Sequence, residues 1–281
     1  MNKNINFRAC LGNNLIGYDE LSYVKDSILH KNLFRYSKKS SFSSKMEKIF
    51  LKYFSVKHAL LLVNGTSSLR CALMSLNPIP GDHVVVPGLT FVATVNSVLS
   101  SGLIPCIVDV DKSGHLSPHA LSHYLEKCSK KPLAVIVAHL DGSGANIQDI
   151  LKICDYYSIP LIEDVAQSFG VKKFSKYLGT FGLFGCFSFQ QNKILSSGEG
   201  GLLITNSINH FNKAIRFSDH GCERPDRYFP SWDEYSFFGE NYKITEICSA
   251  ILLAQLKKFD LIKDLVTENY KILTSFFLKK N

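Results

Sequence analysis

Lys193 stands between an aromatic-rich run and a cluster of glycines in the stretch SFQQNKILSSGEGG, which covers residues 188–201. An amine in a desolvated site holds its proton less tightly than a free lysine and can attack a carbonyl carbon. The glycines that follow let the backbone adopt unusual dihedral angles and approach a ligand closely. A solvated loop lysine is the ordinary alternative, and other residues of the chain must decide between the two.

Three other candidate positions also follow apolar runs. Gly65 and Thr66 open a predicted helix, whose free N–H groups and dipole favour a bound phosphate; an N-cap without a ligand is the alternative. Asp164 ends the run LIED, and a carboxylate there needs a partner such as a protonated heterocyclic nitrogen, unless it caps a helix or pairs with a lysine. Phe91 follows a Pro-Gly break, where it can stack on a planar ring or pack in the core.

These residues follow predicted strands that alternate with predicted helices. The strand runs are apolar throughout, which is typical of parallel strands covered on both faces. Ligands of such sheets bind at the carboxyl ends of the strands. The sequence therefore predicts an α/β fold with a mostly parallel sheet sandwiched by helices, and two strands around Lys193 within residues 187–206. The strand predictions rest on the runs HALLLV, HVVV, IPCIVDVD, LAVIVAHL, IPLIED, GCFSF and GLLITN.

Three parts are expected along the chain: an N-terminal helical segment (1–40), a large α/β domain (41–250) and a helix leading away from it (251–281). Helical spacing of apolar residues predicts helices within 18–30 and 44–53. No apolar run is long enough to span a bilayer, and the first residues lack the apolar core of a signal peptide. We therefore expect no membrane association and a cytoplasmic location.

The composition argues against several other classes of protein. The net charge is +8, but the lysines are dispersed along the chain, so no nucleic-acid partner is expected. The eight cysteines form no CxxC pair, which argues against a metal site and favours buried, reduced thiols. A nicotinamide-dependent dehydrogenase would carry a G-x-G-x-x-G fingerprint, whereas GEGG lacks the full pattern and precedes a strand.

Four stretches are informative when taken together: PGLTFVATVNSV, IEDVAQSFG, LGTFGLFGCFSFQQNKILSSGEGGLLITN and GENYKITEICSAILLAQL. They resemble the DegT/DnrJ/EryC1/StrS family of pyridoxal 5'-phosphate (PLP)-dependent sugar aminotransferases, which has the aspartate-aminotransferase-like fold of type I. The resemblance runs from about residue 15 to residue 270. It implies PLP as cofactor, with Lys193 bonded to its aldehyde and Asp164 beside its ring nitrogen. The other implied contacts are Phe91 on the ring face, Gln167 near the ring hydroxyl, Gly65, Thr66 and Ser188 at the phosphate, Asn241 at the phosphate of the neighbouring subunit, and His220 near the substrate.

The resemblance also implies a homodimer with active sites at the subunit interface. The implied reaction moves an amino group from glutamate or glutamine to a keto-sugar, typically nucleotide-linked, or to a cyclitol ketone. Some relatives carry histidine instead of the lysine and dehydrate sugars, so Lys193 favours amino transfer. The stretch QQNK is similar to that of glutamine-dependent cyclitol aminotransferases.

Family members usually continue into a small C-terminal domain that helps to close the site. The chain of 281 residues is expected to lack most of that domain. A second hypothesis follows, in which the chain is a truncated relative that binds PLP without turnover or acts as a partner subunit. An amino donor that changes the spectrum of the bound cofactor distinguishes the enzyme from the inactive relative.

Overall fold

The computed structural model describes residues 15–36, 41–225 and 229–278. The strands are β1 (His58–Leu62), β2 (His83–Pro87), β3 (Ile104–Val108), β4 (Ala134–Ala138), β5 (Leu161–Asp164), β6 (Lys172–Lys173), β7 (Lys176–Tyr177), β8 (Phe184–Ser188) and β9 (Gly201–Thr205). The helices are α2 (Tyr18–Leu29), α3 (Phe42–Phe54), α4 (Gly65–Met74), α5 (Val92–Leu99), α6 (Pro118–Lys127), α7 (Ile147–Tyr156), α8 (Ile208–Phe217), α9 (Glu246–Lys257) and α10 (Phe259–Leu278).

One seven-stranded sheet forms the centre of the molecule, with the strand order β1-β9-β8-β5-β4-β2-β3. The five strands from β8 to β3 in that order are parallel, whereas β9 runs antiparallel to both of its neighbours. β8 and β9 therefore form the predicted pair around Lys193. The predicted α/β fold with a mostly parallel sheet is confirmed. The small hairpin of β6 and β7 was not anticipated from the sequence pattern.

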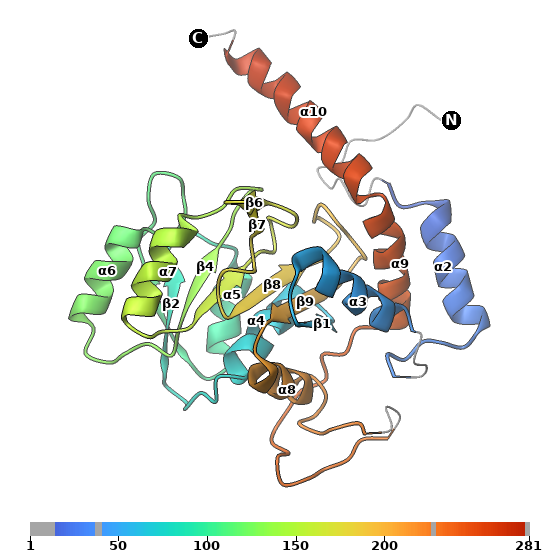
Figure 1. Cartoon of the computed structure of the whole chain (residues 1–281), viewed down its shortest axis with the longest axis horizontal. Coiled ribbons are helices and arrows are strands. Elements are labelled where there is room, and N and C mark those ends of the chain that lie inside the picture. Colours follow the sequence, from blue (N-terminus) through green and yellow to red (C-terminus); the bar gives the residue numbers. More distant parts are fainter. Residues whose placement is uncertain (1–14, 37–40, 226–228, 279–281) are drawn as a thin grey trace.

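Strand residues alternate between two helical layers because the pleat points successive side chains to opposite faces. In β5, Ile162 packs with α4, α5 and α8, whereas Leu161 packs with α6 and α7. In β1, Leu60 joins the first layer and Leu61 packs with α3 and α9. Figure 1 shows α6 and α7 toward one end of the sheet and α3 and α9 toward the other. By this alternation Asp164 belongs to the face that carries α4 and α5.

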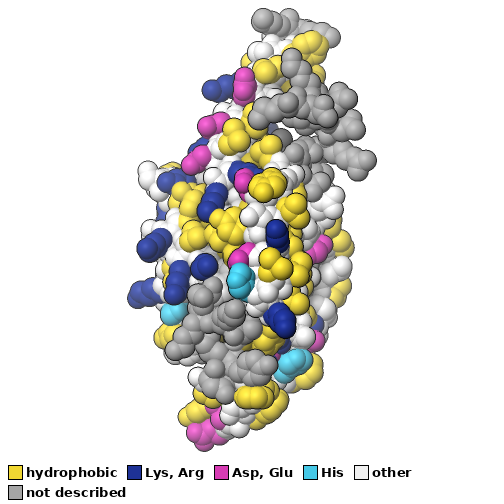
Figure 2. Space-filling model, turned by 90° about the vertical axis from the view of Figure 1, so that its right-hand side faces the viewer, with side chains coloured by type: hydrophobic (Ala, Val, Ile, Leu, Met, Phe, Trp, Pro, Cys, Tyr) yellow, Lys and Arg dark blue, Asp and Glu magenta, His cyan; other side chains and the backbone are white. Residues whose placement is uncertain are grey.

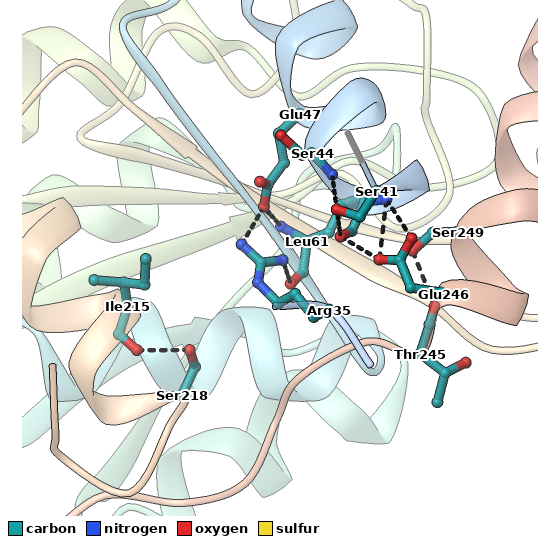
Figure 3. A network of polar contacts seen from close by, with 11 residues as sticks. Arg35, Ser41, Ser44, Glu47, Leu61, Ile215, Ser218, Thr245, Glu246 and Ser249 are labelled. Carbon is teal, nitrogen blue, oxygen red and sulfur yellow. Dashed lines mark hydrogen bonds and ion pairs between the residues drawn. The ribbon is translucent and has the colours of Figure 1, made fainter. Parts of the chain in front are cut away.

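A buried polar network joins the N-terminal part of the chain to the sheet and to α9 (Figure 3). The Arg35 guanidinium lies 2.6 Å from the Glu47 carboxylate and donates to the carbonyl oxygen of Leu61 at 3.0 Å. The Glu246 carboxylate accepts from the backbone N–H of Ser43 at 3.3 Å and from the Ser43 hydroxyl. A carboxylate is favoured there because the first N–H groups of a helix lack partners within the helix. The Glu246 side chain, at the first residue of α9, thus links this helix to the first turn of α3.

The C-terminal helices lie at the same end of the molecule as α2. α9 crosses the expected boundary between residues 250 and 251, and the division of the chain into three parts stays a prediction. α10 extends away from the body, and Leu273, Phe276 and Phe277 on it are exposed. Figure 2, which views this side of the molecule, shows hydrophobic and charged side chains interspersed. Residues 1–14, 37–40 and 279–281 of the expected segments lie outside the described residues.

None of the helices in the described ranges combines the length and the hydropathy of a membrane span.

Candidate active site

A cavity of about 380 Å³ opens beside the carboxyl end of β5, next to the first turns of α4 and α5. Lys193 and Asp164 both line it, although they come from different parts of the chain. The structure thus places the candidate nucleophile and the candidate buried carboxylate in one site. The other predicted site residues that line the same cavity are Gly65, Thr66, Phe91, Gln167 and Ser188.

Asp164 is the last residue of β5, and 8 % of its surface is exposed. Its Oδ2 accepts a hydrogen bond from the Thr94 hydroxyl at 2.8 Å, and its Oδ1 accepts from the N–H of Ala166 at 3.1 Å. Burial raises the pKa of this carboxyl, because the charged form loses its hydration, while the two hydrogen bonds and the nearby His139 and Lys193 oppose the rise. The site therefore holds a carboxylate that further positive charge in the cavity would stabilise.

Lys193 lies in the loop between β8 and β9, where its backbone N–H donates to the carbonyl oxygen of Gln190 at 2.9 Å. Its amine lies 5.9 Å from the centroid of the Phe91 ring. Burial lowers the pKa of Lys193, and the charge of Asp164 partly opposes that shift. Within the described ranges, no hydrogen bond or ion pair engages this amine. A partly desolvated amine without a fixed partner is suited to react with a carbonyl group.

The N-terminus of α4 faces the cavity and provides donors for an anion. The Asn64 side chain caps this helix by accepting from the N–H of Ser67 at 2.8 Å. The N–H groups of Gly65 and Thr66 precede the first bonds within the helix and have no acceptor among the described residues. Ser188 ends β8 directly beside this turn, and both positions line the cavity. These donors and the helix dipole suit a phosphate group.

Gln167 lines the cavity but its side chain already has a partner, since Oε1 accepts from the N–H of Asp141 at 3.1 Å. His139 is a further lining residue and is almost fully buried. Its Nδ1 accepts from the N–H of Ala145 at 3.2 Å, so the ring proton lies on Nε2, 3.1 Å from the Glu163 carboxylate. Two fixed contacts thus hold this imidazole in one orientation at the cavity wall.

Two predicted site residues lie outside the cavity. His220 is exposed, has a left-handed backbone with a φ of 59°, and donates its N–H to the carbonyl oxygen of Glu240 at 2.9 Å. Asn241 is also exposed and forms an isolated bridge with Asp219. Their expected roles at the substrate and in the neighbouring subunit stay predictions.

Sequence reasoning did not assign a role to three residues that the fold brings to the site. Thr94 bonds to Asp164, His139 lines the wall, and Glu199 lines the cavity from the glycine-rich loop. His139 was recognisable as a residue at the end of a strand, and Glu199 as part of GEGG. Thr94 lies in the first turn of α5, three residues after Phe91, which is the N-cap of that helix. No three His, Cys, Asp or Glu residues of the described ranges form a metal-binding group.

Comparison with known proteins decides the family. The model of the DegT/DnrJ/EryC1/StrS aminotransferase family matches residues 15–279. The chain belongs to this family. The family that the motifs indicated is thereby confirmed, and with it PLP as the cofactor on which the family depends.

Members of the DegT/DnrJ/EryC1/StrS family with different substrates resemble the chain to a similar degree. GDP-perosamine synthase of Vibrio cholerae is 34% identical over 226 residues, which cover 80% of this chain and 60% of that protein. L-glutamine:2-deoxy-scyllo-inosose aminotransferase of Micromonospora echinospora is 34% identical over 233 residues, covering 80% and 54%. The solved structure of Helicobacter pylori PseC, an aminotransferase involved in the biosynthesis of pseudoaminic acid, superposes with a TM-score of 0.79 at 25% identity, covering 88% of this chain and 64% of that one. The chain thus spans less than two thirds of the length of these family members.

Proposed function

We propose that this protein is a PLP-dependent aminotransferase that moves an amino group from glutamate or glutamine to the ketone of a nucleotide-linked keto-sugar or a cyclitol. The observation that carries the proposal is the meeting of the Lys193 amine and the Asp164 carboxylate in one cavity, beside the open N-terminus of α4. A nucleophile, a carboxylate and a phosphate cradle are the three groups that PLP requires from a protein.

The residues present fit PLP by their chemistry. Gly65, Thr66 and Ser188 would hold the phosphate, because the helix N-terminus offers two N–H groups without acceptors. Asp164 would hold a protonated ring nitrogen, and Phe91 offers an aromatic face at the cavity. When bound, PLP supplies an aldehyde that combines with amino groups and a ring that accepts electrons from the carbon beside them.

Lys193 and Asp164 have complementary tasks in this proposal. Burial favours the neutral amine of Lys193, so that it can bond to an aldehyde and later take or return a proton. The hydrogen bonds from Thr94 and Ala166 favour the ionised form of Asp164, which would keep positive charge on the ring nitrogen. The low-polarity surroundings strengthen the attraction between opposite charges at this position.

The cavity wall also supports a polyhydroxylated acceptor. Gln190 and Glu199 add an amide and a carboxylate group to the lining, and groups of these kinds pair with hydroxyls as donors or acceptors. GDP-perosamine synthase and the inosose aminotransferase, by their names, act on a sugar nucleotide and a cyclitol. These relatives support the proposed substrate class without deciding between its members.

A homodimer in the cytoplasm is the proposed form of the enzyme. Exposed apolar side chains support an association: Leu89, Phe91 and Val92 follow the Pro-Gly break, Ile107 lies on the edge strand β3, and all four are more than half exposed. In a dimer the exposed Asn241 would be available to the neighbouring site.

The first experiment incubates the purified protein with PLP, reduces it with borohydride and maps the labelled peptide by mass spectrometry. We expect a yellow protein that is labelled at Lys193; an unlabelled, colourless protein would contradict the proposal. Glutamate and glutamine are then added separately, and the visible spectrum should shift to that of the pyridoxamine form. A spectrum that no donor changes would support the inactive relative instead. Keto-sugar nucleotides and cyclitol ketones, tested against the pyridoxamine form, identify the acceptor by the return of the original spectrum.

A further inference from the structure

Two threonines form a chain of hydrogen bonds that leads from the cavity wall to Asp164. The Thr94 hydroxyl lies 2.8 Å from Oδ2 of Asp164, and the hydroxyls of Thr90 and Thr94 lie 2.7 Å apart. Thr94 is completely buried, whereas Thr90 lines the cavity. The hydrogen bond from Thr94 to Asp164 joins α5 to the end of β5, which are 70 residues apart in the sequence.

The acceptor at one end fixes the direction of every hydrogen bond in this chain. An ionised carboxylate only accepts hydrogen bonds, so the single hydroxyl proton of Thr94 points to Asp164. The bond between the threonines then takes its proton from Thr90. Donation by Thr90 polarises the Thr94 hydroxyl and makes it a stronger donor to the carboxylate, because hydrogen bonds in a chain reinforce one another.

Thr94 supplies one of two hydrogen bonds that the described residues make to this buried carboxylate; the other comes from the backbone N–H of Ala166. The ionisable groups that face Asp164 are His139 directly after β4, Lys193 from the loop after β8 and Cys186 from β8. Lys193 would change its bonding and its protonation when it reacts with an aldehyde, and Cys186 is a buried thiol. Thr94 is therefore the side-chain donor that stays in place whatever the state of the lysine.

We propose that Thr94, supported by Thr90, is a positioning residue that keeps Asp164 ionised and oriented, and so keeps the proton on the ring nitrogen of PLP. This inference rests on the proposed function. A hydrogen bond to a charged group stabilises that group by about 1.5–3 kcal/mol. Without the Thr94 hydroxyl, the carboxylate holds a proton more tightly and draws it away from the ring nitrogen.

The test uses the full chain loaded with PLP that is labelled with ¹⁵N in the ring. The ¹⁵N chemical shift reports how much of the nitrogen is protonated. In Thr94→Val, the ratio of protonated to unprotonated nitrogen should fall roughly ten- to hundredfold, which corresponds to the loss of one hydrogen bond to a charge. The rate of the half-reaction with the amino donor should fall, while the KM for the donor changes little.

Two further variants separate positioning from packing. Thr94→Ser keeps the hydroxyl and should restore most of the wild-type ¹⁵N shift. Ser97→Ala removes another buried hydroxyl of α5, which donates to the carbonyl oxygen of Thr94 and not to Asp164, and it should leave the shift unchanged. If Thr94→Val does not fold, Thr94→Ala removes the same hydroxyl with less crowding and carries the same expectation.

The outcomes are distinct. A Thr94→Val protein that binds PLP at Lys193 with the wild-type ¹⁵N shift overturns the inference and leaves the proposed function intact. A change of equal size in Ser97→Ala also overturns it, because the effect would then come from helix packing. A wild-type protein that is not labelled at Lys193 overturns the proposed function and this inference together.

Discussion

Gly65 and Ser188 lie so close together that a Cβ on residue 65 would stand 2.8 Å from the Cβ of Ser188. The contact joins the first turn of α4 to the last residue of β8, and both residues line the cavity. Only a residue without a side chain allows the helix N-terminus to approach the strand so closely. The proposed phosphate cradle therefore depends on glycine for its geometry.

Gly65→Ala should push α4 away from β8, because the added methyl also lies 3.3 Å from the carbonyl oxygen of Phe187. We expect a loss of about 1–3 kcal/mol in the free energy of unfolding from overpacking, measured by urea denaturation. The dissociation constant for PLP should rise at least about tenfold, as one lost or misplaced phosphate contact costs about 1.4 kcal/mol or more. Gly17→Ala, where a methyl meets no heavy atom within 4 Å, is the matched control and should bind PLP normally. Equal PLP affinity in both variants would contradict the assignment of the cradle.

Asp164→Asn keeps the size of the side chain and removes its charge. The ring nitrogen then loses the carboxylate that favours its protonated form, so PLP binding should weaken and the half-reaction with glutamate or glutamine should become very slow. Fluorescence titration with PLP and stopped-flow absorbance measure the two effects. Asp155→Asn, a change to a carboxyl that is exposed on α7, serves as the control. A variant that reacts at the wild-type rate would exclude a role of Asp164 at the ring nitrogen.

Lys193→Met should change how the stability of the protein without cofactor depends on pH. Burial lowers the pKa of Lys193 in the folded state, so the unfolded chain binds more protons between the folded pKa and about 10.4. The wild type therefore gains stability as pH rises through this window, while the methionine variant lacks that gain. Urea denaturation of both proteins at pH 7 and pH 10 measures their free energies of unfolding. Relative to the methionine variant, the wild type should be more stable at pH 10 than at pH 7. The same difference at both values would mean that the amine is fully hydrated in the folded state.

Glu163 is a structural carboxylate, although it directly precedes Asp164. It is fully buried and accepts from the N–H groups of Gly179, Phe181 and Gly182 at 2.7–2.8 Å and from His139 at 3.1 Å. Glu163→Gln should lower the free energy of unfolding by about 2–4 kcal/mol, because an amide NH₂ then faces buried donors.

The control for Glu163→Gln is Glu126→Gln, which alters a carboxylate that accepts from Ser122 on the exposed side of α6. This change should stay within about 0.5 kcal/mol of the wild type. Urea denaturation measures both variants at pH 7. If Glu163→Gln were as stable as the control, the described hydrogen bonds would contribute little to the loop that follows β7.

Much of the site was predictable from local patterns in the sequence. Apolar runs that end in polar residues indicated the strands, and the parallel-sheet rule placed Thr66, Phe91, Asp164 and Lys193 at one edge. In the structure these four line one cavity, and their roles stay predictions. The expected contacts of His220 and Asn241 stay predictions, because they involve a substrate or a second subunit.

The amino-acid sequence by itself determined the alternation of strands and helices in the main sheet, the resemblance to the family and the types of residue that end the central strands. Only the tertiary structure decided that Thr94 reaches Asp164, that Gly65 touches Ser188 and that Glu163 binds the loop after β7. These contacts depend on the position of β5 between β4 and β8 and on the register of the strands. Local periodicity shows which face of a strand is buried, but the neighbour on that face is set by pairing between distant segments, which no short stretch of sequence encodes.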